Sequence, residues 1–279
     1  MIIDFHTHIF PADIRRNRDQ YFPAEPAFKL LYQSAKSKLI GAAELLKAMD
    51  AHGVDKSIIF GFPWSNSETY RFHNDYVMQT VQKYPDRFIG LGCFDPADAQ
   101  AFAEAERCLA AGLSGIGELA FYRSGIDDSA LEQLDPIMKI CRNRGLPVLI
   151  HTNEPVGHHY HGKTPVTLAQ IYHLIKRFPH NNIILAHWGG GLFFYSLMKK
   201  EVKADLKNVY FDTAASPFLY DVAVYRIAIE LIGAGKVLFG TDFPLLPPAR
   251  YFSEMDQAGL TRAEVDQICG LNAQALFSL

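Results

Sequence analysis

The chain has 279 residues, and 27 lysine and arginine residues against 30 aspartate and glutamate residues give a formal net charge of −3. This near-neutral balance argues against a nucleic-acid-binding surface and against a basic face that docks on membranes. With 49% hydrophobic and 20% charged residues, the chain has ample material for a large core, which argues against disorder as the main state. No stretch approaches the ~20 consecutive apolar residues that a membrane helix needs.

The amino-terminal segment predicts no secretory signal, because Asp4 interrupts its apolar run almost at once. The four cysteines are scattered without paired spacing, which favours free thiols in a reducing compartment. We therefore expect a cytoplasmic protein. Since no basic surface is available to hold a polyanion, we expect a small-molecule substrate and neither a nucleic-acid nor a membrane partner.

Eight short apolar runs recur along the chain with helical stretches between them. Each run is continuously apolar rather than alternating, as expected of parallel strands that are buried on both faces. The predicted strands are residues 2–9, 56–63, 88–94, 115–121, 147–152, 182–187, 208–213 and 236–241. This order predicts an α/β fold in which residues 1–279 form a single (β/α)8 TIM barrel domain.

Two of the helices have recognisable start signals. A Thr-Pro pair at residues 164–165 predicts the start of a helix whose apolar stripe continues to Phe178 and stops at Pro179. Near the end of the chain, Thr261 and Glu264 have the spacing of a capping box.

Residues 10–40 do not follow the strand–helix order and form an insertion after the first strand. An insertion at the carboxyl end of a barrel strand is either a lid over the site or a surface excursion without a role. The sequence leaves both interpretations open.

The first strand carries three polar residues on one face. Asp4, His6 and His8 alternate along it, so their side chains point to the same side, which is the interior of a barrel. Buried polar groups are unfavourable unless something pairs with them, and two neutral imidazoles on one face can bind a single metal ion. The alternative is a pair of hydrogen-bonded core histidines.

Ionisable residues also follow four of the other predicted strands, and barrel active sites are built at this carboxyl-terminal face. Independent core histidines would not be expected to cluster at the same end of each strand, so the pattern favours a metal centre. The residues are Glu118, His151, His187 and Asp242.

These motifs resemble the amidohydrolase superfamily, and the resemblance spans nearly the whole chain. Asp-x-His-x-His at residues 4–8 and Thr-Asp-x-Pro at residues 241–244 are specific for it, as is the set of strand-end residues between them. The amidohydrolase-related branch is the more similar one. It contains metal-dependent hydrolases as well as decarboxylases related to aminocarboxymuconate-semialdehyde decarboxylase, and its barrels often form homo-oligomers.

The resemblance implies a divalent metal, with zinc as the expected ion and with one or two ions bound. His6, His8 and Asp242 would hold one ion, and His151 and His187 a second, which Glu118 would bridge. In the decarboxylases of this branch, one ion is held through His6, His8, His151 and Asp242 by position, and His187 is free for proton chemistry.

Two features favour hydrolysis in this comparison. Decarboxylases of the branch often carry Glu where this chain has Asp4, and Glu118 matches the carboxylate that bridges two metals in related hydrolases. Asp4 would then orient a ligand histidine. A metal lowers the pKa of bound water toward about 7, and Asp242 would relay the proton of that water while His187 assists as a second catalytic residue.

The main hypothesis is therefore a metal-dependent hydrolase that acts on a small ester, lactone or amide. The alternative is a metal-dependent, non-oxidative decarboxylase of an aromatic or unsaturated carboxylic acid. A third interpretation, a barrel that keeps a metal only for stability, is disfavoured because structural sites usually have four ligands and this set is larger.

Four residues after strand ends are expected to contact the substrate at the barrel mouth. Aromatic walls with one guanidinium would suit a small aromatic or cyclic substrate that carries negative charge. These residues are Trp64, Tyr122, Arg123 and Trp188.

Overall fold

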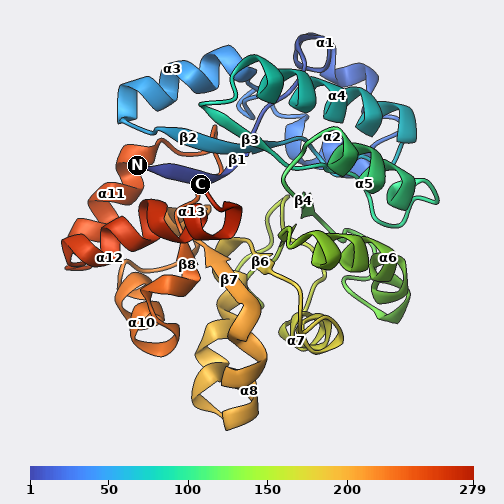
Figure 1. Cartoon of the computed structure of the whole chain (residues 1–279). Coiled ribbons are helices and arrows are strands. Elements are labelled where there is room, and N and C mark those ends of the chain that lie inside the picture. Colours follow the sequence, from blue (N-terminus) through green and yellow to red (C-terminus); the bar gives the residue numbers. More distant parts are fainter.

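The computed structural model describes residues 1–279 and confirms the predicted (β/α)8 barrel, with eight strands inside a ring of helices (Figure 1). All eight predicted strands are present, and each is shorter than its apolar run because the ends of the runs leave the sheet to form loops. The strands are β1 (Ile3–His8), β2 (Lys56–Phe60), β3 (Phe88–Gly90), β4 (Ile116–Leu119), β5 (Val148–Ile150), β6 (Ile183–Leu185), β7 (Val209–Asp212) and β8 (Val237–Leu238).

The strands pair in sequence order, and every pairing is parallel. Strands β1–β3 form one sheet and β4–β8 a second. Two isolated parallel bridges join these sheets, one between Gly92 and Ile116 and one between Thr7 and Phe243. The first strand and the last are therefore neighbours, which brings residues from opposite ends of the sequence to one site.

The helices form the outer layer and also cover one end of the barrel. The ring of Phe5 in β1 stacks on that of Phe277 at 5.7 Å, so the last helix packs against the first strand. No helix combines the length and the apolar character needed to cross a membrane. The helices are α1 (Ala12–Arg16), α2 (Pro26–Tyr32), α3 (Ala42–His52), α4 (Ser67–Lys83), α5 (Ala101–Ala110), α6 (Asp128–Arg144), α7 (Leu168–Arg177), α8 (Lys200–Asp205), α9 (Ser216–Leu219), α10 (Ala223–Ile232), α11 (Pro248–Gln257), α12 (Arg262–Asp266) and α13 (Asn272–Phe277).

The capping signals are confirmed at one helix and corrected at another. Thr261 caps α12 and forms the predicted capping box with Glu264. Helix α7 begins later than predicted, because Thr167 is its N-cap and pairs with Gln170. Thr164 instead lies before the helix, where its backbone N–H and its hydroxyl both donate to the side-chain oxygen of Asn153, at 2.8 and 2.7 Å.

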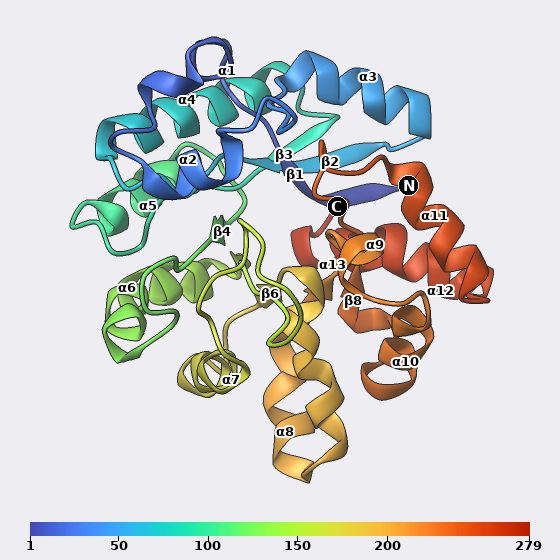
Figure 2. The ribbon, with the colours of Figure 1, turned by 180° about the vertical axis from the view of Figure 1, so that it is seen from behind.

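The insertion after β1 folds into α1, a short 3₁₀ turn and α2. Its ends are tied together by a hydrogen bond from the Phe10 N–H to the Ile40 carbonyl at 2.7 Å, and both views place α1 and α2 beside α4 (Figures 1 and 2). The insertion builds a cluster of rings next to the barrel mouth, which we call the aromatic wall. Its members are Phe10, Phe28, Tyr32, Phe62, Trp64 and His73.

A buried carboxylate fixes the insertion to the loop after β2. Glu25 accepts hydrogen bonds from the backbone N–H groups of Ser65 and Asn66, at 3.0 and 2.8 Å, and from the Ser65 hydroxyl at 3.0 Å. The ring centroids of Phe28 and Trp64 lie 4.4 Å apart across the same contact. Polar and apolar contacts together hold the insertion against the barrel.

Candidate metal centre

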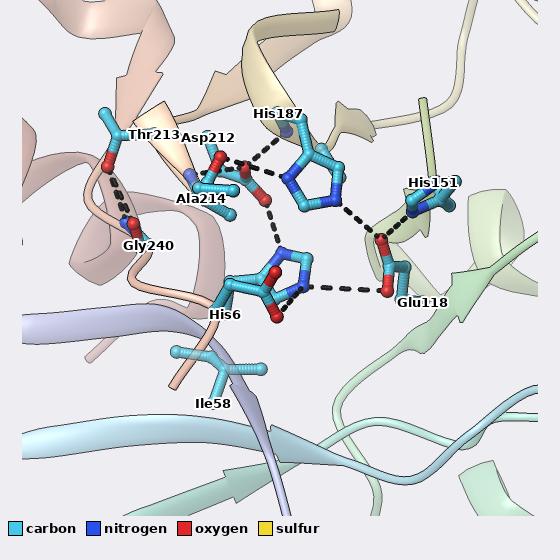
Figure 3. A network of polar contacts seen from close by, with 12 residues as sticks. His6, Ile58, Glu118, His151, His187, Asp212, Thr213, Ala214 and Gly240 are labelled. Atoms are coloured by element: carbon cyan, nitrogen blue, oxygen red, sulfur yellow. Dashed lines mark hydrogen bonds and ion pairs between the residues drawn. The ribbon is translucent and has the colours of Figure 1, made fainter. Parts of the chain in front are cut away.

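The fold brings together the six side chains that the sequence predicts as metal ligands. Figure 3 shows His6, Glu118, His151 and His187 of this set. His6 and His8 lie on β1, Glu118 lies on β4, and the others leave the ends of β5, β6 and β8. All four histidine side chains are buried or nearly so. The six are His6, His8, Glu118, His151, His187 and Asp242.

Asp212 at the end of β7 orients residues at the base of this site, and it is not among the residues that the sequence pattern predicted. It accepts a hydrogen bond from Nδ1 of His6 at 2.8 Å, and it accepts the N–H groups of His187 and Ala214 at 2.8 and 3.0 Å (Figure 3). The sequence does indicate it, because Asp212 is an ionisable residue at the carboxyl end of an apolar run, like other residues of the predicted metal site.

The rings of His8 and His187 are oriented by backbone carbonyls. Nδ1 of His8 donates to the Gly61 carbonyl and Nδ1 of His187 to the Ala214 carbonyl, each at 3.0 Å. A carbonyl only accepts, so these bonds place a hydrogen on Nδ1 and turn Nε2 toward the carboxylates of the centre. Nε2 of His8 then lies 3.3 Å from Asp242, and Nε2 of His187 lies 3.4 Å from Glu118.

Glu118 lies among all four imidazoles. One of its oxygens is 2.8 Å from Nδ1 of His151, and the other is 3.6 Å from Nε2 of both His6 and His8. Burial acts to raise the pKa of this carboxyl. The charges of His6 and His151 and the hydrogen bonds from His151 and His187 outweigh it and hold the pKa well below its usual range. Glu118 is therefore a carboxylate.

The charges of the site also shift the pKa values of the groups next to Glu118. Burial would lower the pKa of His6, but the charges of Glu118 and Asp212 raise it well above its usual value. For His187 burial again acts downward, yet the hydrogen bond and charge of Glu118 and the charge of Asp242 raise its pKa to about 8. The pKa of Asp242 is lowered, since His8, His6 and His187 outweigh the opposing effect of burial.

One buried atom shows that these residues fit a cation. Nε2 of His6 has no hydrogen-bond partner, and the nearest carboxylate oxygens, from Glu118 and Asp242, lie at 3.6 and 3.8 Å. A buried imidazole nitrogen that faces two carboxylates is where a divalent ion would be favourable. Donor atoms lie within 4.8 Å of one another in three overlapping groups, namely His6–His8–Glu118, His6–His187–Asp242 and Glu118–His151–His187.

The backbone at two of these residues is strained in the way that functional sites often are. His187 and Asp242 both have positive φ, 55° and 57°, a region that residues other than glycine rarely adopt. His187 lies two residues after β6 and Asp242 four residues after β8, and both side chains belong to the polar cluster. Trp188 continues the left-handed turn at φ 60°, before three glycines with positive φ.

Asp4 does not have the role that the sequence suggested. Its carboxyl accepts the hydroxyl of Thr241 at 2.6 Å, the N–H of Thr241 at 3.0 Å and the N–H of His6 at 3.2 Å. Asp4 therefore binds the loop after β8 to β1, and it is Asp212 that orients the His6 ring. Burial raises the pKa of Asp4 to about 7, although the hydrogen bonds from Thr241 and His6 act against this.

Both predicted tryptophan contacts are corrected by the structure, because neither side chain reaches the mouth. Trp64 and Trp188 are each 0% exposed. Trp64 packs in the aromatic wall and donates from Nε1 to Nδ1 of His73 at 2.8 Å, while Trp188 donates to the Ser216 hydroxyl at 2.9 Å. These bulky apolar rings follow strand ends, but they lie buried beneath the loops and do not line the mouth.

The other two predicted contacts lie in different environments. Arg123 points to solvent, with its side chain 78% exposed and 3.8 Å from Asp95, so it does not enter the site. Tyr122 is half-buried, and burial followed by the charge of Glu118 raises the pKa of its phenol. Tyr32 in α2 is affected in the same way by Asp242 and Glu118. No sequence signal pointed to Tyr32.

Comparison with known proteins identifies the family. The family model described as Amidohydrolase matches residues 3–279, so the chain belongs to the amidohydrolase family. It is 24% identical to 2-amino-3-carboxymuconate-6-semialdehyde decarboxylase of Dictyostelium discoideum, with 97% of this chain and 92% of that protein aligned. It is 25% identical to gamma-resorcylate decarboxylase of a Polaromonas species, over 84% and 86% of the two chains.

A solved structure shares the fold over the full chain. The 5-carboxyvanillate decarboxylase of Novosphingobium aromaticivorans, complexed with manganese and 4-hydroxy-3-methoxy-5-nitrobenzoic acid, superposes with a TM-score of 0.78 at 19% identity. The match covers 100% of this chain and 96% of that one. This likeness concerns the barrel as a whole.

These findings correct the expected hydrolase and the expected zinc. The named relatives are decarboxylases, and the metal in the solved structure is manganese. The two features that favoured hydrolysis carried too much weight. Asp4 is bound to Thr241, so the length of its side chain says nothing about the metal. Glu118 has imidazoles on both sides, so its position in the site does not depend on a role as a bridge between two ions.

Proposed function

We propose that this chain is a metal-dependent, non-oxidative decarboxylase of a small aromatic or unsaturated carboxylic acid. The observation that carries the proposal is the alignment of nearly the whole chain with proteins that are themselves decarboxylases. The polar cluster at the carboxyl ends of the strands supports it, since it offers both metal-binding nitrogens and a proton donor.

The residues that would hold a divalent ion are those whose donor atoms point inward. We assign His6, His8, His151 and Asp242 as ligands, with Glu118 among them to balance the charge of the ion. A bound divalent ion would supply positive charge that attracts the acid and stabilises negative charge as carbon dioxide leaves. Carboxylate and imidazole donors together suit manganese as well as zinc, and the manganese in the solved structure favours it for the first experiment.

His187 is the candidate for the proton that decarboxylation requires. When the bond between the carboxyl group and the rest of the substrate breaks, its electron pair stays on the substrate carbon, which must take up one proton. Burial acts to lower the pKa of His187, but the hydrogen bond and charge of Glu118 raise it, which favours the proton-bearing form. The bond from Nδ1 to the Ala214 carbonyl turns Nε2 toward the cavity. The products are carbon dioxide and a new C–H bond, and no electrons are gained or lost overall.

The wall of the site supports an aromatic substrate. Burial and the charges of the carboxylates of the centre raise the pKa of the Tyr32 and Tyr122 phenols. The ring of Tyr122 is stacked with that of Phe62 at 6.4 Å. Aromatic surfaces next to a few polar groups are typical of small-ligand sites. We further propose that residues 10–40, held by Glu25, are a fixed cover for this site within a single domain of residues 1–279.

The four cysteines are all free and buried, which supports a reducing compartment such as the cytoplasm. A homo-oligomer stays a prediction from the family resemblance.

The test is an assay of carbon dioxide release by purified protein that has been reconstituted with Mn²⁺. The panel would contain 2,6-dihydroxybenzoate, 5-carboxyvanillate and an unsaturated aliphatic acid, and a second panel would contain aryl esters and lactones. We expect carbon dioxide from at least one acid and no turnover of the esters or lactones. Hydrolysis of the second panel without release of carbon dioxide would reject the proposal.

A further inference from the structure

One histidine of the metal centre is held differently from the other three. His6, His8 and His187 donate from Nδ1 to Asp212, to the Gly61 carbonyl and to the Ala214 carbonyl. His151 is reversed, because its Nδ1 faces Glu118 at 2.8 Å while its Nε2 lies 3.0 Å from the Gly162 carbonyl. Both partners only accept, so Nε2 donates to the Gly162 carbonyl and Nδ1 to the Glu118 carboxylate. Nδ1 is the nitrogen that faces the centre, where a bound ion would take the place of its hydrogen.

The acceptor for His151 does not belong to the strand framework. Gly61 and Ala214 lie within two residues of the ends of β2 and β7, whereas Gly162 lies near the end of a long loop that follows β5, which we call the β5 loop (residues 154–163). This yellow-green loop lies at the centre of the ring in Figure 2. Most of its residues are exposed, including His158, His159 and His161.

Three side chains of the β5 loop hold Gly162 in place. The Glu154 carboxylate accepts the Tyr160 hydroxyl at 2.9 Å and the Lys163 ammonium at 2.9 Å, and Lys163 also donates to the Val156 carbonyl at 2.8 Å. The side chains of Glu154 and Lys163 are only 15% and 14% exposed, so solvent screens this pair weakly. Tyr160 and Lys163 flank Gly162, and both are bound to the same carboxylate.

Gly162 also lies near the insertion after β1. A Cβ placed on Gly162 would lie 3.5 Å from the ring of Tyr160 and 4.0 Å from Leu31 in α2. The loop and the insertion therefore come close together at Gly162, and the hydrogen bonds of the loop define where its carbonyl lies.

We propose that Glu154 is a positioning residue of the metal centre. Through Tyr160 and Lys163 it fixes the Gly162 carbonyl, which in turn sets the hydrogen-bearing nitrogen of His151 and aims Nδ1 at the metal beside Glu118. The inference rests on the metal site of the proposed function. It adds that the orientation of His151 depends on the β5 loop, which the ion pair between Glu154 and Lys163 helps to hold together.

The experiment measures Mn²⁺ affinity rather than turnover. Metal is removed from the full-length protein by chelation, and Mn²⁺ is titrated by calorimetry into the unaltered chain, Glu154→Gln and Lys163→Met. Loss of a group that orients a metal ligand typically weakens metal affinity by about 10–100-fold, and we expect both variants to fall in this range. Lys163→Arg keeps a cation for Glu154 and should bind more tightly than Lys163→Met.

The matched control is His159→Ala, which removes an exposed side chain from the same loop and should leave the affinity unchanged. Unfolding midpoints of the metal-free proteins separate this role from a general one in stability, and Lys163→Met leaves the Glu154 carboxylate intact. Folded Glu154→Gln and Lys163→Met proteins that bind Mn²⁺ as tightly as the unaltered chain would overturn the proposal. An unaltered chain that binds no Mn²⁺ would also overturn it.

The two proposals can fail separately. Weakened Mn²⁺ binding in Glu154→Gln, without carbon dioxide release from any acid by the unaltered chain, would keep the positioning role and reject the decarboxylase. Carbon dioxide release by the unaltered chain, together with unchanged affinity in Glu154→Gln, would give the reverse result.

Discussion

The metal centre and the aromatic wall lie side by side, both are buried, and both contain histidine, yet their histidines are satisfied in different ways. In the aromatic wall His73 accepts from Trp64 at one ring nitrogen and lies 2.6 Å from the Ile9 carbonyl at the other, so both nitrogens are used. In the metal centre Nε2 of His6 is buried with no partner at all. Burial therefore does not separate a structural histidine from a functional one.

The charges around the two histidines differ as strongly as their hydrogen bonds. Burial lowers the pKa of His73 to about 4, with no carboxylate nearby to oppose it, so His73 is neutral. His6 lies between Glu118 and Asp212, whose charges raise its pKa despite equal burial. A buried ring nitrogen that faces carboxylates without a hydrogen-bond partner is thus the feature that identifies the functional region.

The largest expected effect comes from removing the proton donor of the metal centre. His187→Asn should lower kcat for decarboxylation by about 10²–10⁴-fold, the usual contribution of a positioned acid or base, and should leave Mn²⁺ affinity nearly unchanged. Steady-state kinetics and Mn²⁺ calorimetry measure the two quantities. Loss of metal binding together with activity would instead make His187 a ligand.

A smaller effect is expected from the carboxylate that orients His6. Asp212→Asn removes the charge that fixes the hydrogen on Nδ1 of His6, so Mn²⁺ affinity should fall by about 10–100-fold. The exposed Asp221 provides a matched control, and Asp221→Asn should bind Mn²⁺ like the unaltered chain. Equal affinity in Asp212→Asn would show that the His6 ring keeps its orientation without this hydrogen bond.

In the aromatic wall the prediction concerns stability and not activity. Trp64→Phe removes the hydrogen bond to His73, leaves a buried acceptor unpaired and should lower the free energy of unfolding by about 1–3 kcal/mol. KM should not change, because Trp64 does not reach the mouth. Urea denaturation and kinetics test both parts. A raised KM at unaltered stability would make Trp64 a substrate contact after all.

The smallest effect is expected at Glu264, a carboxylate near the surface that is hydrogen-bonded by Arg226 and Thr261 in the folded protein. Hydrogen bonds from Arg226, followed by those from Thr261, lower the pKa of Glu264 to about 2. The folded pKa is depressed, so the stabilisation is present above about pH 4.5 and is lost as pH falls toward 2. Glu264→Gln should lose this part of the acid dependence, which high salt should also weaken. Acid unfolding curves measure it, and identical curves for both proteins would contradict the prediction.

Much of the fold could be predicted because it depends on local patterns. Continuous apolar runs indicate strands that are buried on both faces, and their count and spacing predict the barrel. The metal-centre residues lie in the second half of such a run or directly after it, and parallel strands bring these positions to one end of the barrel. Asp212 obeys the same rule and could have been found.

Other parts depended on contacts that the sequence does not display. Trp64 and Trp188 follow strands as the polar residues do, but apolar rings pack beneath the loops, where they lose contact with water. Helix α7 begins at Leu168 because Thr167 caps it with Gln170, while Thr164 is bound to Asn153 in the preceding loop. Tyr32 reaches the carboxylates because Glu25 and Phe28 fix the insertion to the loop after β2.

The sequence by itself determined the barrel and its family, and it predicted the residues that gather at the candidate metal centre, since these follow from residue type and from position at the carboxyl ends of the strands. The tertiary structure alone decided which nitrogen each histidine presents, because a ring is oriented by the acceptor that its other nitrogen meets. For His6 that acceptor is 206 positions away along the chain. For His151 it is the backbone of the β5 loop, which Glu154 holds together through Tyr160 and Lys163.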